Sequence, residues 1–197
     1  MPKVYTELEK QHIKKRLKEE AASCMSIYGV KKTTVDELVK RVRIPKGTFY
    51  LFYENKEVLF FEVLYELHEL VEEKFLSKLR DHGEDISVDS LADWITQMYL
   101  DSSNLSMLKV METGDWEMLM RKLPEDVIKN HVLHDNDLIL ALSQYIPQIA
   151  NKNLEDFAAA LRAIFIMLVY KKEIGMKNFT EVLRLTIRGV VLQLLEE

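Results

Sequence analysis

Pro45 divides a stretch of helical periodicity near the start of this chain into two short segments. Proline lacks a backbone N–H and its ring clashes with the preceding turn, so it is tolerated only in the first turn of a helix. The segment before it repeats apolar residues on one helical face: Val35, Leu38, Val39 and Val42. About three residues then separate the two helices, the length of the turn in a helix-turn-helix pair.

The flanking sequence predicts a first and a fourth helix around this pair. Thr6 with Glu9, and Thr34 with Glu37, have the spacing of capping boxes, in which each side chain satisfies a backbone N–H of the other residue. An apolar stripe from Ile13 to Tyr28 predicts a first helix that Gly29 ends. Asn55 is placed to cap a long helix that continues to about Leu79. These four helices place the start of the chain in an all-α fold.

Helical periodicity also dominates the rest of the chain, and strand signals are nearly absent. We expect further helices over residues 87–101, 104–120, 124–146, 153–173 and 178–196. The fold class is therefore all-α. We divide it into an N-terminal three-helix helix-turn-helix domain over residues 1–56 and a C-terminal helical domain over residues 57–197.

The helix that begins at Pro45 is expected to have one anchoring face and one displayed face. Phe49, Phe52 and Tyr53 share the first, while Lys46, Gly47 and Tyr50 share the second. Glycine costs about 1 kcal/mol in a helix relative to alanine, so Gly47 indicates that something approaches the backbone closely. The alternative is an ordinary exposed helix with a tolerated glycine. Lys46 supplies positive charge, and the hydroxyls of Thr48 and Tyr50 suit phosphate oxygens.

Charge is distributed unevenly along the chain. Residues 1–56 hold 13 Lys/Arg and 7 Asp/Glu, a net charge of +6, although the whole chain has a net charge of −5. A basic patch of this kind is the electrostatic footprint of a polyanion partner. Lys56 adds to it, since a cation in the first turn of a helix opposes the helix dipole unless an external anion offsets it. The charge pattern indicates a polyanion, and the helix-turn-helix pair makes double-stranded DNA the candidate partner.

The stretch TTVDELVKRVRIPKGTFYLFYENKEVLF, residues 33–60, resembles the helix-turn-helix signature of TetR-family (tetracycline-repressor-type) transcriptional regulators. The similarity runs from the first helix to the start of the fourth, and its Lys-Gly-Thr-aromatic-Tyr core followed by Asn-Lys-Glu is specific. The resemblance implies a homodimer whose C-terminal domain binds a ligand and dimerises. The expected function is a ligand-responsive DNA-binding regulator, namely a repressor that binds a palindromic operator and is released by a small apolar or aromatic effector.

The resemblance also implies roles for single residues in DNA binding. Lys46 and Gly47 match positions that meet bases or the adjacent backbone. Positions that hold phosphates match Thr34, Thr48, Tyr50 and Lys56.

The chain departs from the family pattern in the turn. Val42 and Arg43 replace the usual Ala-Gly pair, and Pro45 replaces the common serine, so the hydroxyl cap is lost. A non-glycine residue in a left-handed turn costs on the order of 1 kcal/mol. Either Arg43 avoids that conformation or a contact offsets the strain, and we hypothesise that its side chain adds a phosphate contact.

Methionines and tryptophans cluster between residues 94 and 120. Methionine adapts to varied apolar shapes, so this segment suits a pocket for a hydrophobic or aromatic ligand, although such residues are also common in plain cores. The candidate ligand-contacting residues are Trp94, Met98, Tyr99, Met107, Met111, Trp116, Phe165 and Tyr170.

The last two expected helices carry apolar faces. Residues 157–170, FAAALRAIFIMLVY, combine small residues with a nearly continuous apolar surface, and a matching stripe runs along residues 183–194. Both helices can be buried within one monomer. The resemblance implies instead that they form a four-helix dimer interface.

The remaining signals are weaker and leave two alternatives open. His131 and His134 lie one helical turn apart, a spacing that can bind a metal in a metal-responsive regulator, although we expect no metal and no cofactor. No nucleophile–base motif or phosphate-binding loop emerges, so an enzyme on a helical scaffold is the less favoured alternative. Cys24 is the sole cysteine, and no signal peptide or membrane span is apparent, which predicts a cytoplasmic protein.

Overall fold

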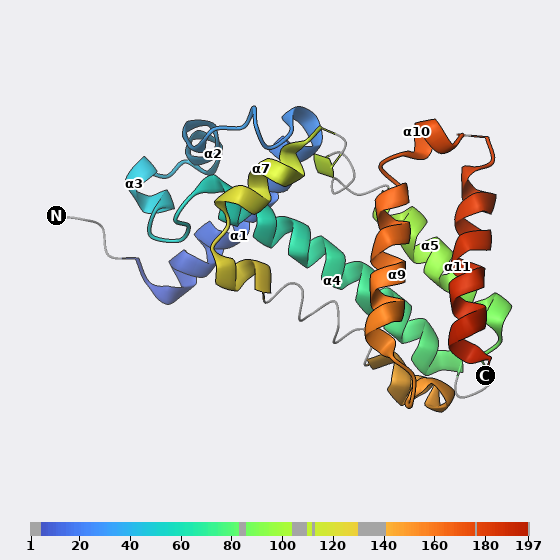
Figure 1. Cartoon of the computed structure of the whole chain (residues 1–197). Coiled ribbons are helices and arrows are strands. Elements are labelled where there is room, and N and C mark those ends of the chain that lie inside the picture. The colour runs from blue at the N-terminus through green and yellow to red at the C-terminus, as the bar shows by residue number, and fades with distance from the viewer. Residues whose placement is uncertain are drawn as a thin grey trace. The chain divides into compact units, whose positions relative to one another are not determined.

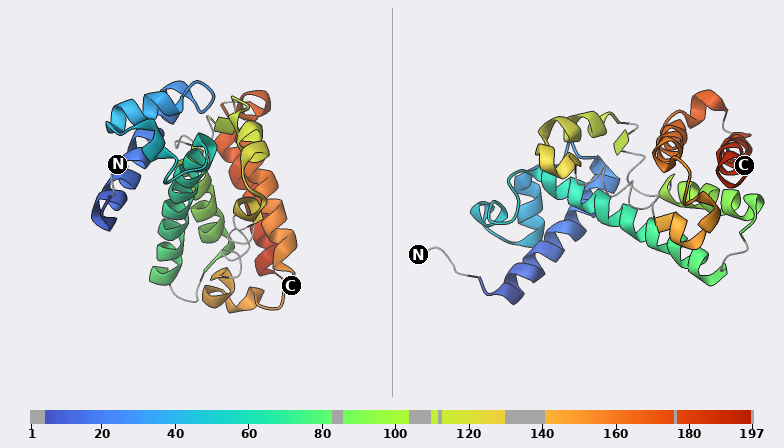
Figure 2. Two further views of the ribbon diagram at one scale, coloured as in Figure 1. Left: turned by 90° about the vertical axis from the view of Figure 1, so that its left-hand side faces the viewer. Right: turned by 60° about the horizontal axis from the view of Figure 1, so that its bottom comes forward.

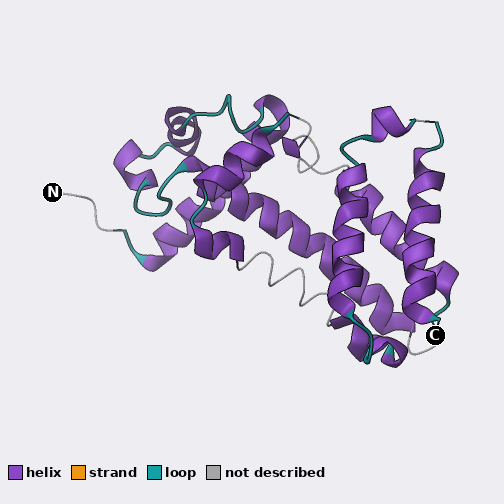
Figure 3. Ribbon diagram, viewed as in Figure 1, coloured by secondary structure: helices purple, strands orange, loops and turns teal. Residues whose placement is uncertain are grey.

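The computed structural model describes residues 5–82, 86–103, 110–111, 113–129, 141–175 and 177–196. Within these ranges every regular element is helical, as Figures 1 and 3 show, and the expected all-α class is confirmed. None of the helices in the described part of the chain is long and apolar enough to cross a membrane. The chain packs into two compact units, which are described separately.

The first unit comprises residues 1–67 together with residues 109–124. It contains α1 (Glu7–Tyr28), α2 (Val35–Val42), α3 (Lys46–Phe49), the first part of α4 (Lys56–His82) and α7 (Asp115–Lys122). Its core is built from the apolar faces that the sequence predicts on α1, α2 and α4. The largest fully buried side chains are Leu17, Met25, Leu38, Phe49, Leu59, Phe60, Leu64 and Leu119.

Local capping signals agree with the sequence in two places and differ in one. The Thr6–Glu9 capping box is complete, and the Asn55 side chain accepts a hydrogen bond from the Val58 N–H at 2.9 Å. Thr34 accepts from the Glu37 N–H at 3.2 Å, but the Glu37 carboxylate is hydrogen-bonded to Arg41 instead of returning to the cap. The second capping box is therefore half formed.

The second unit comprises residues 68–108 and 125–197. It contains the second part of α4, α5 (Val88–Ser103), η1 (Pro147–Ile149), α9 (Leu154–Met167), α10 (Lys171–Ile174) and α11 (Phe179–Leu195). Figure 2 shows α11 beside both α5 and α9. The side chains buried along α11 are Phe179, Leu183, Ile187, Val191 and Leu194. On the surface, ion pairs join α11 to α5: Arg184 to Asp93 at 2.6 Å, Arg188 to Asp89 at 2.7 Å and Arg184 to Asp89 at 3.7 Å.

Three expected helices differ from the structure. The helix expected over 104–120 is interrupted at Gly114, whose φ of 69° is left-handed, and α7 begins one residue later. The helix expected to run to residue 173 stops at Met167, and a turn over 168–170 precedes α10. Of the helix expected over 124–146, residues 125–129 and 141–145 are helical and the intervening residues lie outside the described ranges.

The packing units also divide the chain differently from the expected domains. The first unit extends past residue 56 to residue 67 and takes in α7, which the sequence analysis placed in the C-terminal domain. Cys24 is fully buried on α1, and burial raises the pKa of its thiol.

Candidate nucleic-acid interface

The turn after α2 places Arg43 in the left-handed conformation, with φ 62° and ψ 47°. Its N–H donates to the Val39 carbonyl, and the Ile44 N–H donates to the same oxygen at 3.0 Å. The sequence analysis left open whether Arg43 avoids this conformation, and the structure shows that it does not. The residue performs the helix-ending role that glycine usually has.

Arg16 of α1 explains how this turn is held. Its guanidinium donates to the Arg41 carbonyl at 3.2 Å and to the Val42 carbonyl at 3.5 Å, at the end of α2. The last carbonyls of a helix lack partners within the helix, and a cation there also interacts favourably with the helix dipole. We infer that this contact offsets part of the strain at Arg43. No pattern in the sequence indicates this contact of Arg16.

Arg43→Gly is expected to separate stability from DNA binding. Glycine removes a strain of about 1 kcal/mol in the left-handed region, so the free energy of unfolding should be unchanged or rise by up to that amount. DNA affinity should fall, and the dependence of log K on log salt should weaken by about 0.9, the value for one lost phosphate contact. Fluorescence anisotropy across a salt series measures both. Equal affinity for the variant and the parent at every salt concentration would contradict a phosphate contact by Arg43.

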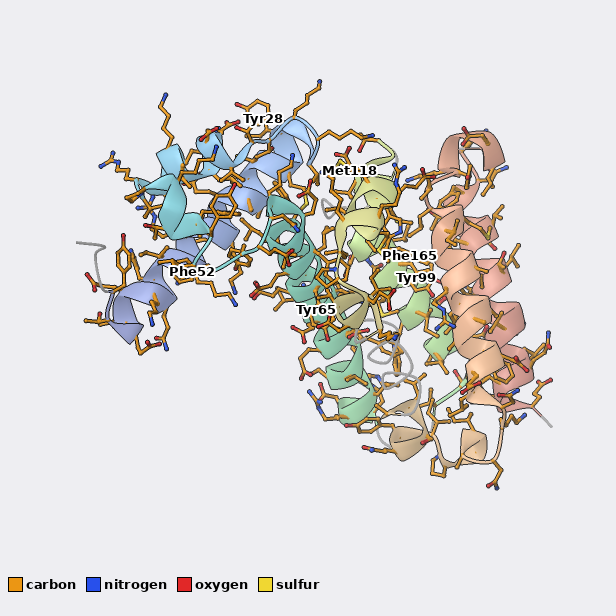
Figure 4. The ribbon with its side chains drawn as sticks, turned by 60° about the vertical axis from the view of Figure 1, so that its left-hand side comes forward. Tyr28, Phe52, Tyr65, Tyr99, Met118 and Phe165 are labelled. Atoms are coloured by element: carbon orange, nitrogen blue, oxygen red, sulfur yellow. The ribbon has the colours of Figure 1, made fainter. Side chains whose placement is uncertain are left out.

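α3 is a single helical turn that Pro45 precedes as N-cap residue. The Thr48 N–H donates to the Pro45 carbonyl at 2.9 Å, and tight turns over residues 50–52 follow in place of the longer helix expected. Phe49 is fully buried and Tyr53 nearly so, whereas Phe52, which is labelled in Figure 4, is half-buried in the turn that follows α3. The anchoring face is thus made mainly by Phe49 and Tyr53.

Lys46, Gly47 and Tyr50 are exposed, as the sequence analysis expected of a displayed face. A methyl group added at Gly47 would meet no atom within 4 Å, so packing inside the protein does not require glycine there. The Tyr50 ring is 51% exposed and meets the Phe49 ring edge-on, with centroids 5.3 Å apart. The displayed face is therefore a small, open surface made of an ammonium, a bare backbone and a hydroxyl.

Thr48 lies elsewhere than the sequence analysis expected. It is 6% exposed, and its Oγ1 lies 3.2 Å from the Tyr5 hydroxyl, near the start of α1. Thr48 follows Gly47 by about 100° around the helix, which turns its side chain towards the protein. A phosphate contact by Thr48 stays a prediction and would require this hydroxyl pair to rearrange.

Lys56 is half-buried and has an internal role that the sequence did not reveal. Its Nζ donates to the carbonyls of Val30, Lys31 and Thr33, at 2.8, 3.4 and 2.6 Å, so it binds the loop between α1 and α2. Burial lowers the pKa of this ammonium. The sequence suggested that a DNA phosphate offsets the unfavourable position of this cation in the first turn of α4. In the structure, the three carbonyl oxygens offset it. A phosphate contact by Lys56 stays a prediction.

Asp115, the first residue of α7, binds the N–H groups of the same loop. This carboxylate is 2% exposed and accepts from the Val30 N–H at 2.7 Å and from the Lys31 N–H at 3.3 Å. A carboxylate is stabilised at a helix N-terminus, so Asp115 suits its position in α7 as well as the loop. Asp115 and Lys56 together satisfy donors and acceptors of one loop that precedes α2.

Two further residues of α2 lie at this surface. Thr34, its exposed N-cap, presents its hydroxyl beside the first turn of the helix. Asp36 pairs with Lys46 across the helix-turn-helix, with Nζ 2.9 Å from Oδ1 and 3.0 Å from Oδ2. This hydrogen bond raises the pKa of Lys46 above its ordinary value.

The candidate ligand-contacting residues are divided between the two units. In the second unit the Tyr99 and Phe165 rings meet edge-on with centroids 5.5 Å apart, as Figure 4 shows. The Tyr99 hydroxyl donates to the Leu161 carbonyl at 2.9 Å. Trp94 and Met98 are half-buried on α5, and Tyr170 is 55% exposed.

Two other candidates, Met111 and Trp116, belong to the first unit, where the ring centroids of Trp116 and Phe61 are 6.5 Å apart. The remaining candidate, Met107, lies outside the described residues, as do His131 and His134. Among the residues that the structure does describe, no group of three or more His, Cys, Asp or Glu side chains is placed to hold a metal ion.

The first unit is thus a helix-turn-helix domain with an exposed, lysine-bearing turn of helix. Residues 18–63 match the family model of bacterial regulatory proteins of the tetR family. The match runs from α1 through α2 and α3 to the start of α4, so this part of the chain is similar to the helix-turn-helix DNA-binding domain of that family.

Two curated relatives from Bacillus subtilis (strain 168) each match a part of the chain. The chain is 34% identical over 77 residues to the uncharacterized HTH-type transcriptional regulator YdgC. This match covers 38% of this chain and 40% of YdgC. Over 50 residues, 42% are identical to the uncharacterized HTH-type transcriptional regulator YhgD, which covers 25% and 26%. The matches therefore span less than half of either relative.

A solved structure resembles nearly the whole fold. The fatty acid degradation regulator FadR from Bacillus halodurans aligns with 96% of this chain and 97% of its own, with a TM-score of 0.50 and 15% identity. At this identity the likeness shows the all-helical fold alone.

Proposed function

We propose that the protein is a ligand-responsive transcriptional repressor that binds a palindromic DNA operator as a homodimer. The single observation that carries the proposal is the displayed surface that Lys46, Gly47 and Tyr50 form at α3 and its C-cap, within the basic first 56 residues. A recognition helix must bring donors and backbone close to base edges and phosphates. The open space around Gly47 is suited to such an approach.

Gly47→Ala is the sharpest test of this surface. Alanine meets no internal atom and is the better helix former, so the free energy of unfolding should stay unchanged or rise by up to about 1 kcal/mol. If DNA backbone or bases approach this position, the added methyl group should weaken specific binding by about tenfold, equivalent to 1.4 kcal/mol.

The DNA for this test comes from selection out of a random pool, because a palindrome would establish function, symmetry and half-site spacing together. Two recognition helices of a dimer lie about 34–36 Å apart, or a longer whole number of DNA turns. Affinity should fall steeply as salt rises. A pool without an enriched sequence, or a Gly47→Ala variant that binds the selected operator as tightly as the parent, would argue against the proposed interface.

The homodimer is supported by apolar side chains that α9 and α11 leave exposed. Ile166 is 50% exposed and Leu185 is 57% exposed, while the small Ala159 and Ala163 on α9 permit close approach of another helix. We propose that α9 and α11 of two copies form a four-helix interface. Enrichment of a palindrome in the selection experiment supports this symmetry.

We propose a small apolar or aromatic effector that binds in the C-terminal domain and releases the protein from DNA. The edge-on contact of Tyr99 with Phe165 supports an aromatic-lined site. FadR is a fatty acid degradation regulator, so acyl compounds should be tested as effectors together with aromatic compounds.

A tenfold loss of DNA affinity requires the effector to favour the non-binding state by about 1.4 kcal/mol. We propose α4 as the element that carries this effect, because its residues contribute to both units. The second candidate function is a metal-responsive regulator that uses His131 and His134. Metal-dependent DNA binding that His131→Ala and His134→Ala abolish would favour it over an apolar effector.

A further inference from the structure

The ion pair between Asp36 and Lys46 joins the two helices of the helix-turn-helix at its exposed surface. Lys46 is the first residue of α3, and Asp36 is the second residue of α2. The Lys46 Nζ lies 2.9 and 3.0 Å from the two oxygens of the carboxylate, and the side chains are 51% and 70% exposed. A residue proposed to read DNA is therefore held by an acid before DNA arrives.

An acid at this place is unfavourable for binding any DNA. Its charge repels phosphates irrespective of sequence, and this repulsion is strongest at low salt. Other acids of the first unit neutralise cations outside the proposed DNA contacts, as Glu37 does with Arg41 and Glu62 with Lys14. Asp36 instead holds the ammonium group proposed to read a base.

Pairing with Asp36 changes what the Lys46 ammonium group can do. A lysine side chain is a point charge on a flexible stem, and alone it follows the nearest phosphate. An ammonium group has three donors, so Lys46 can remain bonded to Asp36 and still donate to a base acceptor. Ordering the stem before binding lowers the entropy lost in a contact that requires one geometry.

We propose that Asp36 is a positioning residue that makes Lys46 select a base in preference to an arbitrary phosphate. This inference rests on the proposed function, since it requires a specific operator. Asp36 weakens binding to all DNA through its charge, and it strengthens only the complex in which Lys46 meets the correct base edge. The two effects have different dependences on DNA sequence, so they can be separated.

The test compares Asp36→Asn with the parent protein on the selected operator and on a scrambled duplex of equal length. Binding to the scrambled duplex should tighten by about two- to fivefold, and its salt slope should steepen by about 0.9 as Lys46 takes up a phosphate. Binding to the operator should stay equal or weaken. The ratio of the two dissociation constants should therefore fall by at least about two- to fivefold, and a repeated selection should lose preference at one operator position per half-site.

Three controls distinguish positioning from a charge or folding effect. Glu19→Gln removes the same charge from an acid that faces Lys15 on α1 at 4.0 Å, and it should change both affinities equally. Asp36→Glu should restore part of the ratio. In a Lys46→Ala background, Asp36→Asn should leave the ratio unchanged.

The possible outcomes distinguish a failure of the positioning role of Asp36 from a failure of the proposed function. If no operator is enriched for the parent protein, the proposed function fails. If the parent protein selects an operator but Asp36→Asn shifts both affinities by the same factor, Asp36 is only a surface charge and the positioning role is overturned.

Discussion

Phe49→Ala is expected to destabilise the DNA-binding unit by about 3–5 kcal/mol, the usual cost of removing a large aromatic side chain from a core. Phe49 is fully buried, and its ring contacts the rings of Tyr50 and Tyr53 at centroid distances of 5.3 and 5.8 Å. α3 has only one turn, and its buried residues are Thr48 and Phe49. The large Phe49 ring is therefore its main anchor. Small domains are stable by about 5–15 kcal/mol, so the substitution should remove a large share of the stability of this unit.

Denaturant unfolding followed by circular dichroism measures the loss, and operator binding should fall with it. Leu51→Ala is the matched control: Leu51 is two residues away and 70% exposed, so its truncation should change stability by no more than about 0.5 kcal/mol. If Phe49→Ala cost no more than Leu51→Ala, α3 would be held by something other than its buried ring.

Asp115→Ala is expected to have the second largest effect, about 3 kcal/mol, even though Asp115 lies far from the helix-turn-helix in sequence. The substitution removes the acceptor of the buried Val30 N–H and of the Lys31 N–H. A buried donor without a partner costs about 1–3 kcal/mol, and charged acceptors form the stronger hydrogen bonds. The loop before α2 then loses the acceptor of its N–H groups, while Lys56 still binds its carbonyls.

Hydrogen exchange at the Val30 amide gives a local measurement of this effect, beside global unfolding. Asp115→Asn keeps one oxygen acceptor and should cost less than alanine. Glu117→Ala changes an exposed acid on the same helix and should leave Val30 exchange unaltered. Slow Val30 exchange in the Asp115→Ala variant would contradict the role assigned to this carboxylate.

The displayed surface of the candidate interface could be predicted because its determinants are local. Pro45 stops one helix and precedes the next, and three neighbouring positions on the following turn face outward for geometric reasons alone. The same holds for the caps made by Thr6 and Asn55, whose partners lie three residues away. Such signals depend on spacing, which is visible in the sequence.

The internal bonding of the interface could not be predicted in the same way. The motif assigns Thr48 and Lys56 to DNA, but Tyr5 and the carbonyls of the α1–α2 loop lie within their reach in the folded chain. Arg16 reaches the end of α2 from another helix, and no pattern around it in the sequence indicates that contact. A polar side chain bonds whichever group the packing brings near, and this depends on every helix in the unit.

By itself the sequence determined the helical class, most helix ends around the turn, and the residues that α3 exposes. Apolar periodicity, caps and proline act over a few residues, so they remain legible without the fold. Only the tertiary structure decided that α7 belongs with the DNA-binding unit. There Asp115 meets Val30 across 85 positions, and Lys122 pairs with the buried Glu57 at 2.9 Å. Contacts between segments so far apart follow from packing in three dimensions, for which spacing along the chain carries no signal.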